Sequence, residues 1–472
     1  MKEITNILQK IDNIVWGLPL IIIIIMTGLF LTIRLRGLQI RKLGTAFKLI
    51  FKEEKDGKGE VSSFGALCTA LSATIGTGNI VGVATAIGIL AGGPGALFWM
   101  WIAALLGMAT KYAEGFLAIK YRHIDEKGHV LGGPFYYIEK GMGQKWKWLA
   151  KLFAIFGSCV ALFGIGTFTQ VNGIANSAKT IFDPNLKHTV SIFGREYSWA
   201  VIIVAIVLTI VVALVIIGGI KRIALASEIV VPFMAGLYII SVITLIICNI
   251  TKLPAAIGEI FSYAFGFKAI AGGTLASIAI AMRMGVARGI FSNEAGLGSA
   301  PIAAAAAKTK EPVRQGLISM IGTFVDTVVV CTMTGLAIVI TGVWRDKSLE
   351  GVEVTIKAFQ KGITFIPNNV AAIMLMICLI FFAFTSIIGW NYYGERCIEY
   401  LTNKNKILMV AYRCVFIAAI FIGPYLTVTA IWTITDIFNG LMAIPNIIAL
   451  LALSPIIVVG TREYLNKNKK IK

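Results

Sequence analysis

The stretch Ser72-Ala-Thr-Ile-Gly-Thr-Gly-Asn79 interrupts an apolar segment that covers residues 64–95. Its two glycines lie near the middle of this segment, where glycine weakens an α-helix. A break in a membrane-spanning helix exposes N–H and C=O groups that lipid cannot hydrogen-bond, so it persists only where these groups contact protein, a cavity or a ligand. We therefore predict a broken membrane helix with a binding site at residues 75–79.

The chemistry of such a break suits a small zwitterion. The half-helix that begins near Thr77 directs free N–H groups and the positive end of its dipole at a carboxylate, whereas the carbonyl groups that end the preceding half-helix can hold a cation. A purely structural interpretation is that Gly78, Gly82, Gly88 and Gly92 only allow neighbouring helices to approach closely. A dinucleotide-binding loop is excluded, because the glycine spacing has one residue too many and no strand precedes it.

The composition places the rest of the chain in a membrane. Of 472 residues, 57% are hydrophobic and only 14% are charged, a profile that soluble domains do not approach. Apolar stretches of spanning length predict an all-α integral membrane protein with eleven transmembrane helices, at residues 14–34, 64–95, 97–119, 149–178, 199–218, 227–249, 271–303, 314–343, 369–394, 408–423 and 428–460. No small-residue cleavage site follows the first of them, which predicts a retained helix rather than a signal peptide.

The net charge of +19 is explained by membrane topology rather than by nucleic acid binding. The basic residues concentrate in short loops between the predicted spans. If the N-terminus lies outside, 29 of the 43 lysines and arginines fall on the cytoplasmic side and 11 fall outside, as the positive-inside rule requires. We expect a multi-pass protein of the plasma or inner cell membrane, with its N-terminus outside and its C-terminus in the cytoplasm.

The second and seventh predicted helices are rich in glycine and lie five helices apart. Because five is odd, they enter the membrane from opposite sides, which predicts two inverted five-helix repeats with a midplane site of the kind found in transporters. The expected organisation is an N-terminal segment with one extra helix and a basic loop (1–60), a first repeat (61–250), an inverted second repeat (268–460) and a basic cytoplasmic tail (461–472).

Cysteine and histidine usage does not indicate a metal centre or an enzyme. The seven cysteines are scattered singly through or beside apolar segments, without CxxC spacing. The three histidines, His123, His129 and His188, fall in predicted loops, and neither an HExxH motif nor a serine, histidine and acid arrangement is evident. An enzyme and a cofactor are therefore not expected. A channel is a further alternative, but no repeated selectivity-filter sequence occurs.

Four longer motifs carry a resemblance to a known family. They are Ala70-Leu-Ser-Ala-Thr-Ile-Gly-Thr-Gly-Asn-Ile-Val-Gly82, Gly92-Gly-Pro-Gly-Ala-Leu-Phe-Trp-Met-Trp101, Gly132-Gly-Pro-Phe-Tyr-Tyr-Ile-Glu139 and Ile290-Phe-Ser-Asn-Glu-Ala-Gly-Leu-Gly-Ser-Ala-Pro301. Over essentially its whole length the chain resembles the alanine or glycine:cation symporter family (sodium:alanine symporters), of the amino acid-polyamine-organocation superfamily.

The resemblance implies a LeuT-type fold, in which one N-terminal helix precedes the core of two five-helix repeats. It also implies a function: sodium-coupled symport of alanine, glycine or both into the cell by alternating access. Na+ would be the coupling ion, and the lipid bilayer and the amino acid the other partners. Proton-coupled symport of small neutral amino acids is the alternative.

The resemblance also implies which residues of the second helix bind the substrate: Thr74, Ile75, Gly76, Thr77, Gly78 and Asn79. The backbone amides of Thr74 and Gly78 would bind the carboxylate. For Asn79, a role in a second sodium site and a direct contact with the substrate are equally open.

One sodium ion, by the same resemblance, would lie between carbonyl groups near Ser72 and Ile75 and the hydroxyl groups of Thr385 and Ser386 on the ninth helix. The alternative for these hydroxyl groups is a hydrogen bond back to their own helix.

The fourth and ninth helices offer further pocket residues. Gln170 lies near or just above mid-bilayer, where its amide would either hydrogen-bond the substrate or join helices by polar contacts. Phe168 would cap the pocket from outside. Trp390, one turn beyond Ser386, would either close it from below or serve as a packing residue.

The seventh helix is expected to break at residues 281–285 if it matches the sixth core helix of a LeuT-type fold. Ser277 would then lie one or two turns above the break. Ile280 and Met282, together with Phe168, are candidate walls that would exclude larger amino acids by steric clash.

Four ionisable residues lie within the predicted spans close to this site. Arg283 and Arg288 are expected either to pair with Glu294 or to reach a water-filled cavity toward the cytoplasm. Asp326 is either a proton or cation relay or a buried, hydrogen-bonded structural residue.

Overall fold

The computed structural model describes residues 2–469 except 53, 55, 56, 90, 127, 193, 194, 217, 218, 267–273 and 427. The expected starts of the second repeat, at 268, and of the seventh span, at 271, lie outside the described residues. So do the last three residues of the expected basic tail.

The chain is almost entirely helical. Its first half contains α1 (Lys2–Val15), α2 (Leu18–Arg34), α3 (Leu38–Arg41), α4 (Leu43–Ile50), α5 (Ser63–Thr74), a π-helical turn (Gly78–Gly82), α6 (Val83–Ile87), α7 (Gly95–Tyr121), α8 (Pro134–Tyr136), a second π-helical turn (Tyr137–Gly141), a 3-10 turn (Gln144–Trp146), α9 (Lys147–Phe163), α10 (Phe168–Phe182), α11 (Trp199–Ile216) and α12 (Gly219–Cys248).

Its second half contains a 3-10 turn (Ile250–Lys252), α13 (Leu253–Ala264), α14 (Thr274–Asn293), α15 (Ala300–Ala304), α16 (Pro312–Thr323), a longer π-helical segment (Phe324–Cys331), α17 (Thr332–Thr341), a 3-10 turn (Val343–Arg345), α18 (Val352–Gly362), α19 (Asn368–Thr402), α20 (Lys406–Ile422), a 3-10 turn (Gly423–Tyr425), α21 (Val428–Ala452) and α22 (Ser454–Lys469). The two short antiparallel hairpins pair β1 (His123–Ile124) with β2 (Val130–Leu131) and β3 (Thr189–Ile192) with β4 (Arg195–Ser198).

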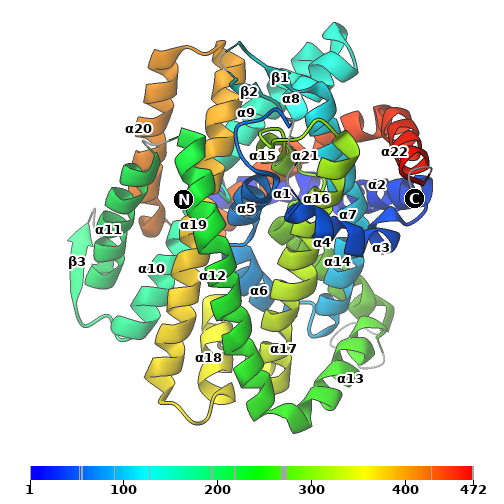
Figure 1. Cartoon of the computed structure of the whole chain (residues 1–472). Coiled ribbons are helices and arrows are strands. Elements are labelled where there is room, and N and C mark those ends of the chain that lie inside the picture. The colour runs from blue at the N-terminus through cyan, green and yellow to red at the C-terminus, as the bar shows by residue number, and fades with distance from the viewer. Residues whose placement is uncertain are drawn as a thin grey trace.

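The long helices run between two ends of the molecule (Figure 1). The β1–β2 hairpin, α8 and α15 lie at the end drawn at the top, which we call the hairpin end. The helices α13 and α18 lie at the bottom, which we call the α18 end. The core between them joins residues from most helices, including the large buried side chains Trp390, Tyr112 and Phe291.

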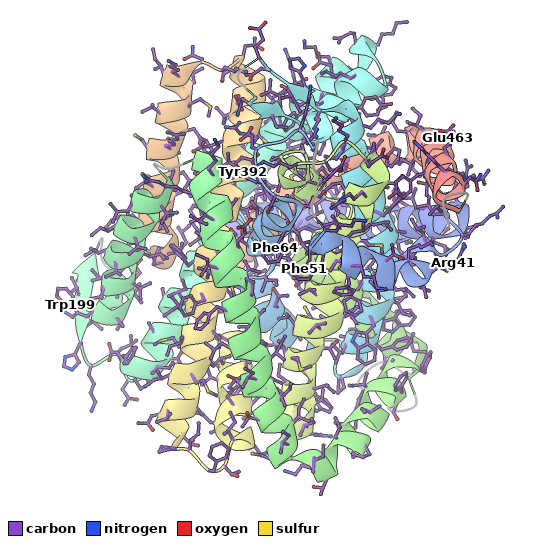
Figure 2. All side chains as sticks on the ribbon, viewed as in Figure 1. Arg41, Phe51, Phe64, Trp199, Tyr392 and Glu463 are labelled. Carbon is purple, nitrogen blue, oxygen red and sulfur yellow. The ribbon has the colours of Figure 1, made fainter. Side chains whose placement is uncertain are left out.

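The outer helices expose apolar side chains, as a lipid-facing surface requires. On α11, Ile203 is 55% exposed and Leu214 is 65% exposed, and on α12 Ile229 is 66% exposed. Trp199 lies at the start of α11 on the outer flank (Figure 2) and is half exposed. The chain is therefore an all-α, multi-pass membrane protein.

Eight helical segments of the described residues are long and apolar enough to cross a membrane, or nine if the bent pair α5 and α6 counts as one span. Of the eleven predicted spans, two are not among these nine. The span at 14–34 corresponds to α2, which is shorter than the others, and the span at 271–303 corresponds to α14 and α15.

The predicted break in the second span is confirmed. Helix α5 ends at Thr74, the direction of the chain changes by 53°, and helical structure resumes at Gly78. Ile75 has an extended backbone with ψ 98°, which ends the helix.

The predicted break at 281–285 in the seventh span is wrong, because α14 continues to Asn293. The interruption follows at residues 294–299, where Glu294, Gly296 and Gly298 have φ values of 56°, 91° and 81°. Two glycines supply this left-handed conformation at little cost. Gly285 has a different purpose: a side chain there would collide with the Ala96 carbonyl group, so this glycine allows α14 to pack closely on α7.

Replacing Gly285 with alanine should therefore lower the stability of the protein. Overpacking of a close helix contact costs about 1–3 kcal/mol, and thermal unfolding of the purified protein in detergent measures the loss. Gly236→Ala is the matched control on α12, because a methyl group there meets nothing within 4 Å. Equal unfolding midpoints for the two variants would contradict this account of Gly285.

Candidate functional site

A cavity of about 750 Å³ extends from the α18 end toward the break in the second span. Its mouth includes the exposed loop 346–350, and its walls come from α6, α10, α14, α18 and α21. Thr77, Arg288 and Trp432 are among the residues that line its deeper part. The cavity therefore connects solvent at one end of the molecule with the broken helix.

The N–H groups of the break are bound by side chains instead of by helical carbonyl groups. The Gly76 N–H donates to Asn79 Oδ1 at 2.8 Å, and the Thr77 N–H donates to Gln170 Oε1 at 3.0 Å. Gln170 is held in place because its Nε2 donates to the Ile165 carbonyl at 2.9 Å. The Thr77 hydroxyl is buried and has no hydrogen-bond partner among the described residues.

Gly76 is required by close packing. A side chain at this position would overlap the Ser386 hydroxyl and the Gln170 amide. The break, α10 and α19 therefore meet at one point, and the sequence prediction that Gly76, Thr77 and Gln170 belong to one site agrees with this geometry.

Asn79 connects the break to a buried carboxylate. Its Nδ2 donates to Asp326 Oδ1 at 2.7 Å, and Asp326 Oδ2 accepts hydrogen bonds from Ser292 at 2.9 Å and Thr327 at 2.7 Å. Asp326 lies in the π-helical segment Phe324–Cys331, a type of irregularity that is frequent at functional sites. The Asp326 side chain is therefore surrounded by one amide and two hydroxyl groups.

Of the predicted sodium ligands, the structure brings two into direct contact. The Ser386 hydroxyl donates to the Ile75 carbonyl at 3.1 Å. Ser72 lies close by, against Gly389 on α19, but its hydroxyl donates to the Thr69 carbonyl at 2.8 Å.

Thr385 does not reach the break. Its hydroxyl donates to the carbonyl groups of Phe381 and Phe382 at 3.0 Å, and it contacts Met234 on α12.

No group of three or more histidine, cysteine or acidic residues that could hold a metal ion occurs in the described part of the chain. A cation at this point would depend on carbonyl and hydroxyl oxygens.

The two ends of the predicted substrate segment lie beside these contacts. Thr74 is the last residue of α5, and its hydroxyl bonds back to Ala70. Gly78 begins the π-helical turn and packs on Phe291, with only 3.2 Å available for a side chain. At the break, side chains accept the hydrogen bonds of the Gly76 and Thr77 amides, whereas Thr74 still belongs to α5.

Of the twelve residues predicted to bind the substrate, Thr77 lines the cavity and the other eleven do not, among them four on α10 and α14 that also lack a contact with the break in the described part of the chain. Ile280 and Met282 are 41% and 37% exposed, so they cannot form its wall in this state. Phe168 packs with Phe163, at 5.8 Å between ring centroids, and Ser277 is buried on α14. The physical reason is helical phase: an unbroken α14 turns Ile280 and Met282 toward the outside of the bundle.

Trp390 lies at the second break rather than at the first. Its indole N–H donates to Glu294 Oε1 at 3.0 Å, and Glu294 also accepts a hydrogen bond from Ser299. Glu294 is therefore satisfied by neutral donors. Of the two alternatives for Arg283 and Arg288, pairing with Glu294 is therefore not found among the described residues.

Arg288 instead pairs with Asp436 on α21, at 2.8 Å. Its guanidinium also lies 4.9 Å from the ring centre of Trp432 and 5.5 Å from that of Phe291. Arg288 lines the cavity on its α18 side, whereas Arg283 is exposed. Only one of the two arginines is therefore part of the site.

The hairpin end is sealed by a dense set of polar contacts. Arg122 donates to carbonyl groups of two loops, which include those of Lys58 at 2.6 Å and Ala307 at 2.7 Å, and also to Thr309. His129 places Nδ1 3.0 Å from Glu60 and Nε2 3.0 Å from Glu399.

These contacts join the loop before α5, the β1–β2 hairpin and the end of α19. The hydrogen bonds to Glu399 and Glu60 raise the pKa of His129 to about 9, although burial and Arg396 act in the opposite direction. His129 is therefore a cation between two carboxylates at neutral pH.

The sequence analysis did not identify Glu114 and Asn446, which bind each other and the backbone of Gly296 at the second break. It also missed Asp436 and Arg122. Glu114 lies inside the predicted span 97–119, and an ionisable residue within a span is by itself an indication of function. Arg122 carries no such indication, because an arginine at the end of a span is ordinary.

Comparison with known proteins identifies relatives that match nearly the whole chain. The model of the sodium:alanine symporter family matches residues 1–472. An uncharacterized transporter of Haemophilus influenzae is 52% identical over 99% of this chain and 97% of its own length. The sodium/alanine symporter AgcS of Methanococcus maripaludis is 45% identical over 99% of both chains. The probable sodium/glutamine symporter GlnT of Bacillus subtilis is 37% identical over 99% of this chain and 92% of its own length.

The contacts of His129 predict a pH dependence of stability. Because folding raises the pKa of His129 from an ordinary value of 6.5 to about 9, its stabilising effect is fully present below pH 6.5 and is lost as the pH rises through 9. The thermal midpoint of the purified protein should fall over this range. His129→Gln should be less stable at pH 7 and should lose this part of the pH dependence, whereas His123→Gln, an exposed control, should not. Identical pH profiles for both variants would show that the imidazolium does not stabilise the seal.

Proposed function

Because the chain belongs to the sodium:alanine symporter family, and is therefore a membrane-embedded, cation-coupled amino acid transporter and not an enzyme, we propose that it carries alanine, glycine or both into the cell together with Na+. One observation carries the proposal. The cavity reaches Thr77, whose N–H donates to the Gln170 side chain and whose hydroxyl has no hydrogen-bond partner in the described part of the chain.

The substrate carboxylate would bind at the Gly76 and Thr77 amides. A carboxylate is a stronger acceptor than a neutral amide oxygen, so it can replace Gln170 Oε1 at the Thr77 N–H and leave the Gln170 side chain to bind the substrate. The Thr77 hydroxyl is the third donor at this point. Thr74, Ile75, Gly78 and Asn79 would then shape the surrounding surface without donating their own amides.

A sodium ion fits best between the Ile75 carbonyl and the Ser386 hydroxyl. Unwound backbone carbonyl groups at the end of a half-helix are typical ligands for Na+ in transporters. Ser72 could add its hydroxyl by a change of rotamer, and Thr385 could join only by turning away from its own helix.

Because Ile280 and Met282 are exposed, other residues must form the pocket wall that excludes larger amino acids. Val81 and Trp432 line the cavity close to Thr77 and Arg288, and we assign the wall to them. If a few side chains form the wall, relatives can differ in substrate by changing those side chains alone. The relatives AgcS and GlnT are named as a sodium/alanine symporter and a probable sodium/glutamine symporter.

The sealed hairpin end would face the cytoplasm and the open cavity would face outside. This assignment follows from the positive-inside rule, because the loops that contain Arg122, Lys140 and Lys404 lie at the hairpin end. The structure would then represent an outward-facing state. In this orientation the N-terminus would lie outside the cell and the C-terminus in the cytoplasm.

Proton coupling is the second candidate, because Asp326 is buried and directly bonded to Asn79 of the break. Uptake of radiolabelled alanine into proteoliposomes separates the two. We expect accumulation with an inward sodium gradient and none with a proton gradient in sodium-free buffer. Accumulation driven by the proton gradient alone would replace sodium with the proton, and no saturable uptake under either gradient would refute symport.

Gln170→Ala should reduce alanine binding at least tenfold while the protein stays monodisperse in detergent. The variant leaves the Thr77 N–H and the Ile165 carbonyl without their partner, which disturbs the break where the carboxylate would bind. Isothermal titration with alanine in sodium buffer measures the effect.

Gln144→Ala makes the same change on the exposed surface and serves as the control. Wild-type affinity of the Gln170 variant would remove the break from the substrate site.

A further inference from the structure

Among the described residues, Arg288 is the charged group on the deeper part of the cavity wall. The other charged residues that line the cavity belong to the loop 346–350 or lie near a helix end at its mouth; they are Lys179, Asp346, Lys347, Glu350 and Glu353. The Arg288 side chain lies within α14 and is 17% exposed. A guanidinium stays charged in a protein, so its charge must be compensated inside the membrane.

Asp436 compensates Arg288 from the side away from the cavity. The guanidinium donates from Nη2 to Asp436 Oδ2 at 2.8 Å and from Nη1 to Oδ1 at 3.4 Å. Asp436 is 8% exposed and is not among the described residues that line the cavity, whereas Arg288 is. Asp12 on α1, a helix that packs on α21, forms no ion pair with Arg288 in the described part of the chain. A substrate in the cavity therefore meets the arginine, while its counter-ion lies behind it.

Two aromatic rings hold the guanidinium independently of Asp436. It lies 4.9 Å from the ring centre of Trp432 and 5.5 Å from that of Phe291, and the two ring centres are 4.9 Å apart. Such cation–π contacts attract a charged guanidinium to the face of a ring. The Arg288 Nε is buried and has no hydrogen-bond partner among the described residues, so Asp436 does not use all of its donors. We therefore expect Arg288 to keep its position when Asp436 loses its charge.

The same rings connect Arg288 with the first break. A side chain on Gly78 would lie 3.2 Å from the Phe291 ring, so this ring packs directly on the break. Trp432 belongs to the wall assigned above, and Thr77 lines the same cavity. The side chain of an amino acid bound at the Thr77 amide would therefore extend along a wall that contains Arg288.

The ion pair makes this wall electrically neutral in sum. An acidic side chain that leaves water needs a cation as its partner, and Asp436 already neutralises Arg288. A basic side chain would face the like charge of Arg288, which is repulsive, and could not reach Asp436 behind it. Alanine and glycine carry no side-chain charge, so they lose nothing at this wall.

We propose that Asp436 restricts the substrates to neutral amino acids by neutralising Arg288, so that this ion pair determines the side-chain charge that the site accepts. Arg288 faces the substrate, and Asp436 acts on the substrate through Arg288. This inference rests on the proposed symport and names the residues that set its substrate class. If the pair only joined α14 to α21, its loss would weaken the uptake of all amino acids alike.

The test is competition for sodium-driven uptake of radiolabelled alanine into proteoliposomes. The competitors are L-aspartate, L-asparagine, which has the shape of aspartate without its charge, and L-2,4-diaminobutyrate, which has a positive side chain. The measured quantity is the half-inhibitory concentration of each charged competitor divided by that of asparagine. Each protein is made with the natural Val81 and with Val81→Ala, which widens the wall for longer side chains.

Asp436→Asn should lower the ratio for aspartate at least tenfold, because Arg288 is then free to bind a second carboxylate. Arg288→Gln should lower the ratio for diaminobutyrate instead, because the negative charge of Asp436 is left without its partner. The combination of Asp436→Asn and Arg288→Gln should restore the wild-type preference for neutral competitors. These opposite shifts separate control of substrate charge from a structural role of the pair.

Glu259→Gln is the matched control. Glu259 pairs with Arg345, which also lies over a tryptophan, 4.3 Å from the ring centre of Trp344. Arg345 is not among the described residues that line the cavity, so this variant should keep both ratios of the wild type.

An unchanged aspartate ratio of Asp436→Asn in both Val81 backgrounds overturns the proposal, as does loss of alanine uptake without a gain of aspartate uptake. If Asp436→Asn cannot be purified, the diaminobutyrate ratio of Arg288→Gln decides in the same way. Failure of the proposed function is a separate result, because it appears as the absence of sodium-driven alanine uptake in the wild type.

Discussion

Every interruption of a helix inside a membrane must find hydrogen-bond partners within the protein, because lipid offers none. In this chain the first break meets the requirement with neutral side chains: Asn79 accepts from Gly76, and Gln170 accepts from Thr77. Both side chains belong to further contacts, to Asp326 and to the Ile165 carbonyl. The N–H groups of Gly76 and Thr77 are therefore connected through Asn79 to the π-helical segment Phe324–Cys331 and through Gln170 to α10.

The second break meets the same requirement differently. The left-handed residues Gly296 and Gly298 direct their N–H groups at a single oxygen of Glu114, and Asn446 joins the same oxygen and also binds the Gly296 carbonyl at 2.9 Å. Successive N–H groups in this conformation form an anion site, which a side chain of the protein already fills. Glu114 accepts from three groups at once, whereas each amide of the first break has a single neutral acceptor, which the substrate carboxylate would replace in the function that we propose.

This difference explains which parts of the site the sequence could predict. Gly76, Thr77 and Asn79 were identifiable because glycine and polar side chains in mid-span are exceptional, and Gln170 was identifiable for the same reason. The second break was misplaced because glycine has two uses in membrane helices that sequence does not separate. Gly285 allows close packing on Ala96, and Gly296 permits a left-handed backbone.

The misplaced break had a further consequence for the predicted wall. Side chains on either side of an interruption change direction. The observed break lies about four helical turns after the predicted one, and Ile280 and Met282 are therefore exposed instead of lining the pocket. The partner of Arg288 was unpredictable for another reason. Asp436 is distant in sequence, and no local pattern shows that α21 brings it to α14.

Whether the two five-helix halves are inverted copies in a LeuT-type arrangement stays a prediction.

The seal at the hairpin end differs in its chemistry from the site that it encloses. Arg122 binds backbone carbonyl groups, and the loop around Lys58 and the segment at Ala307 also pair directly, with the Lys308 N–H donating to the Val61 carbonyl at 2.8 Å. These contacts hold the chain just before α5, and the break frees the other end of α5. A helix of twelve residues that is fastened by polar contacts at one end and interrupted at the other can tilt without breaking its own hydrogen bonds. Opening of the hairpin end would therefore require that Arg122 and His129 release their partners and that the backbone hydrogen bonds between residues 60–61 and 306–308 break.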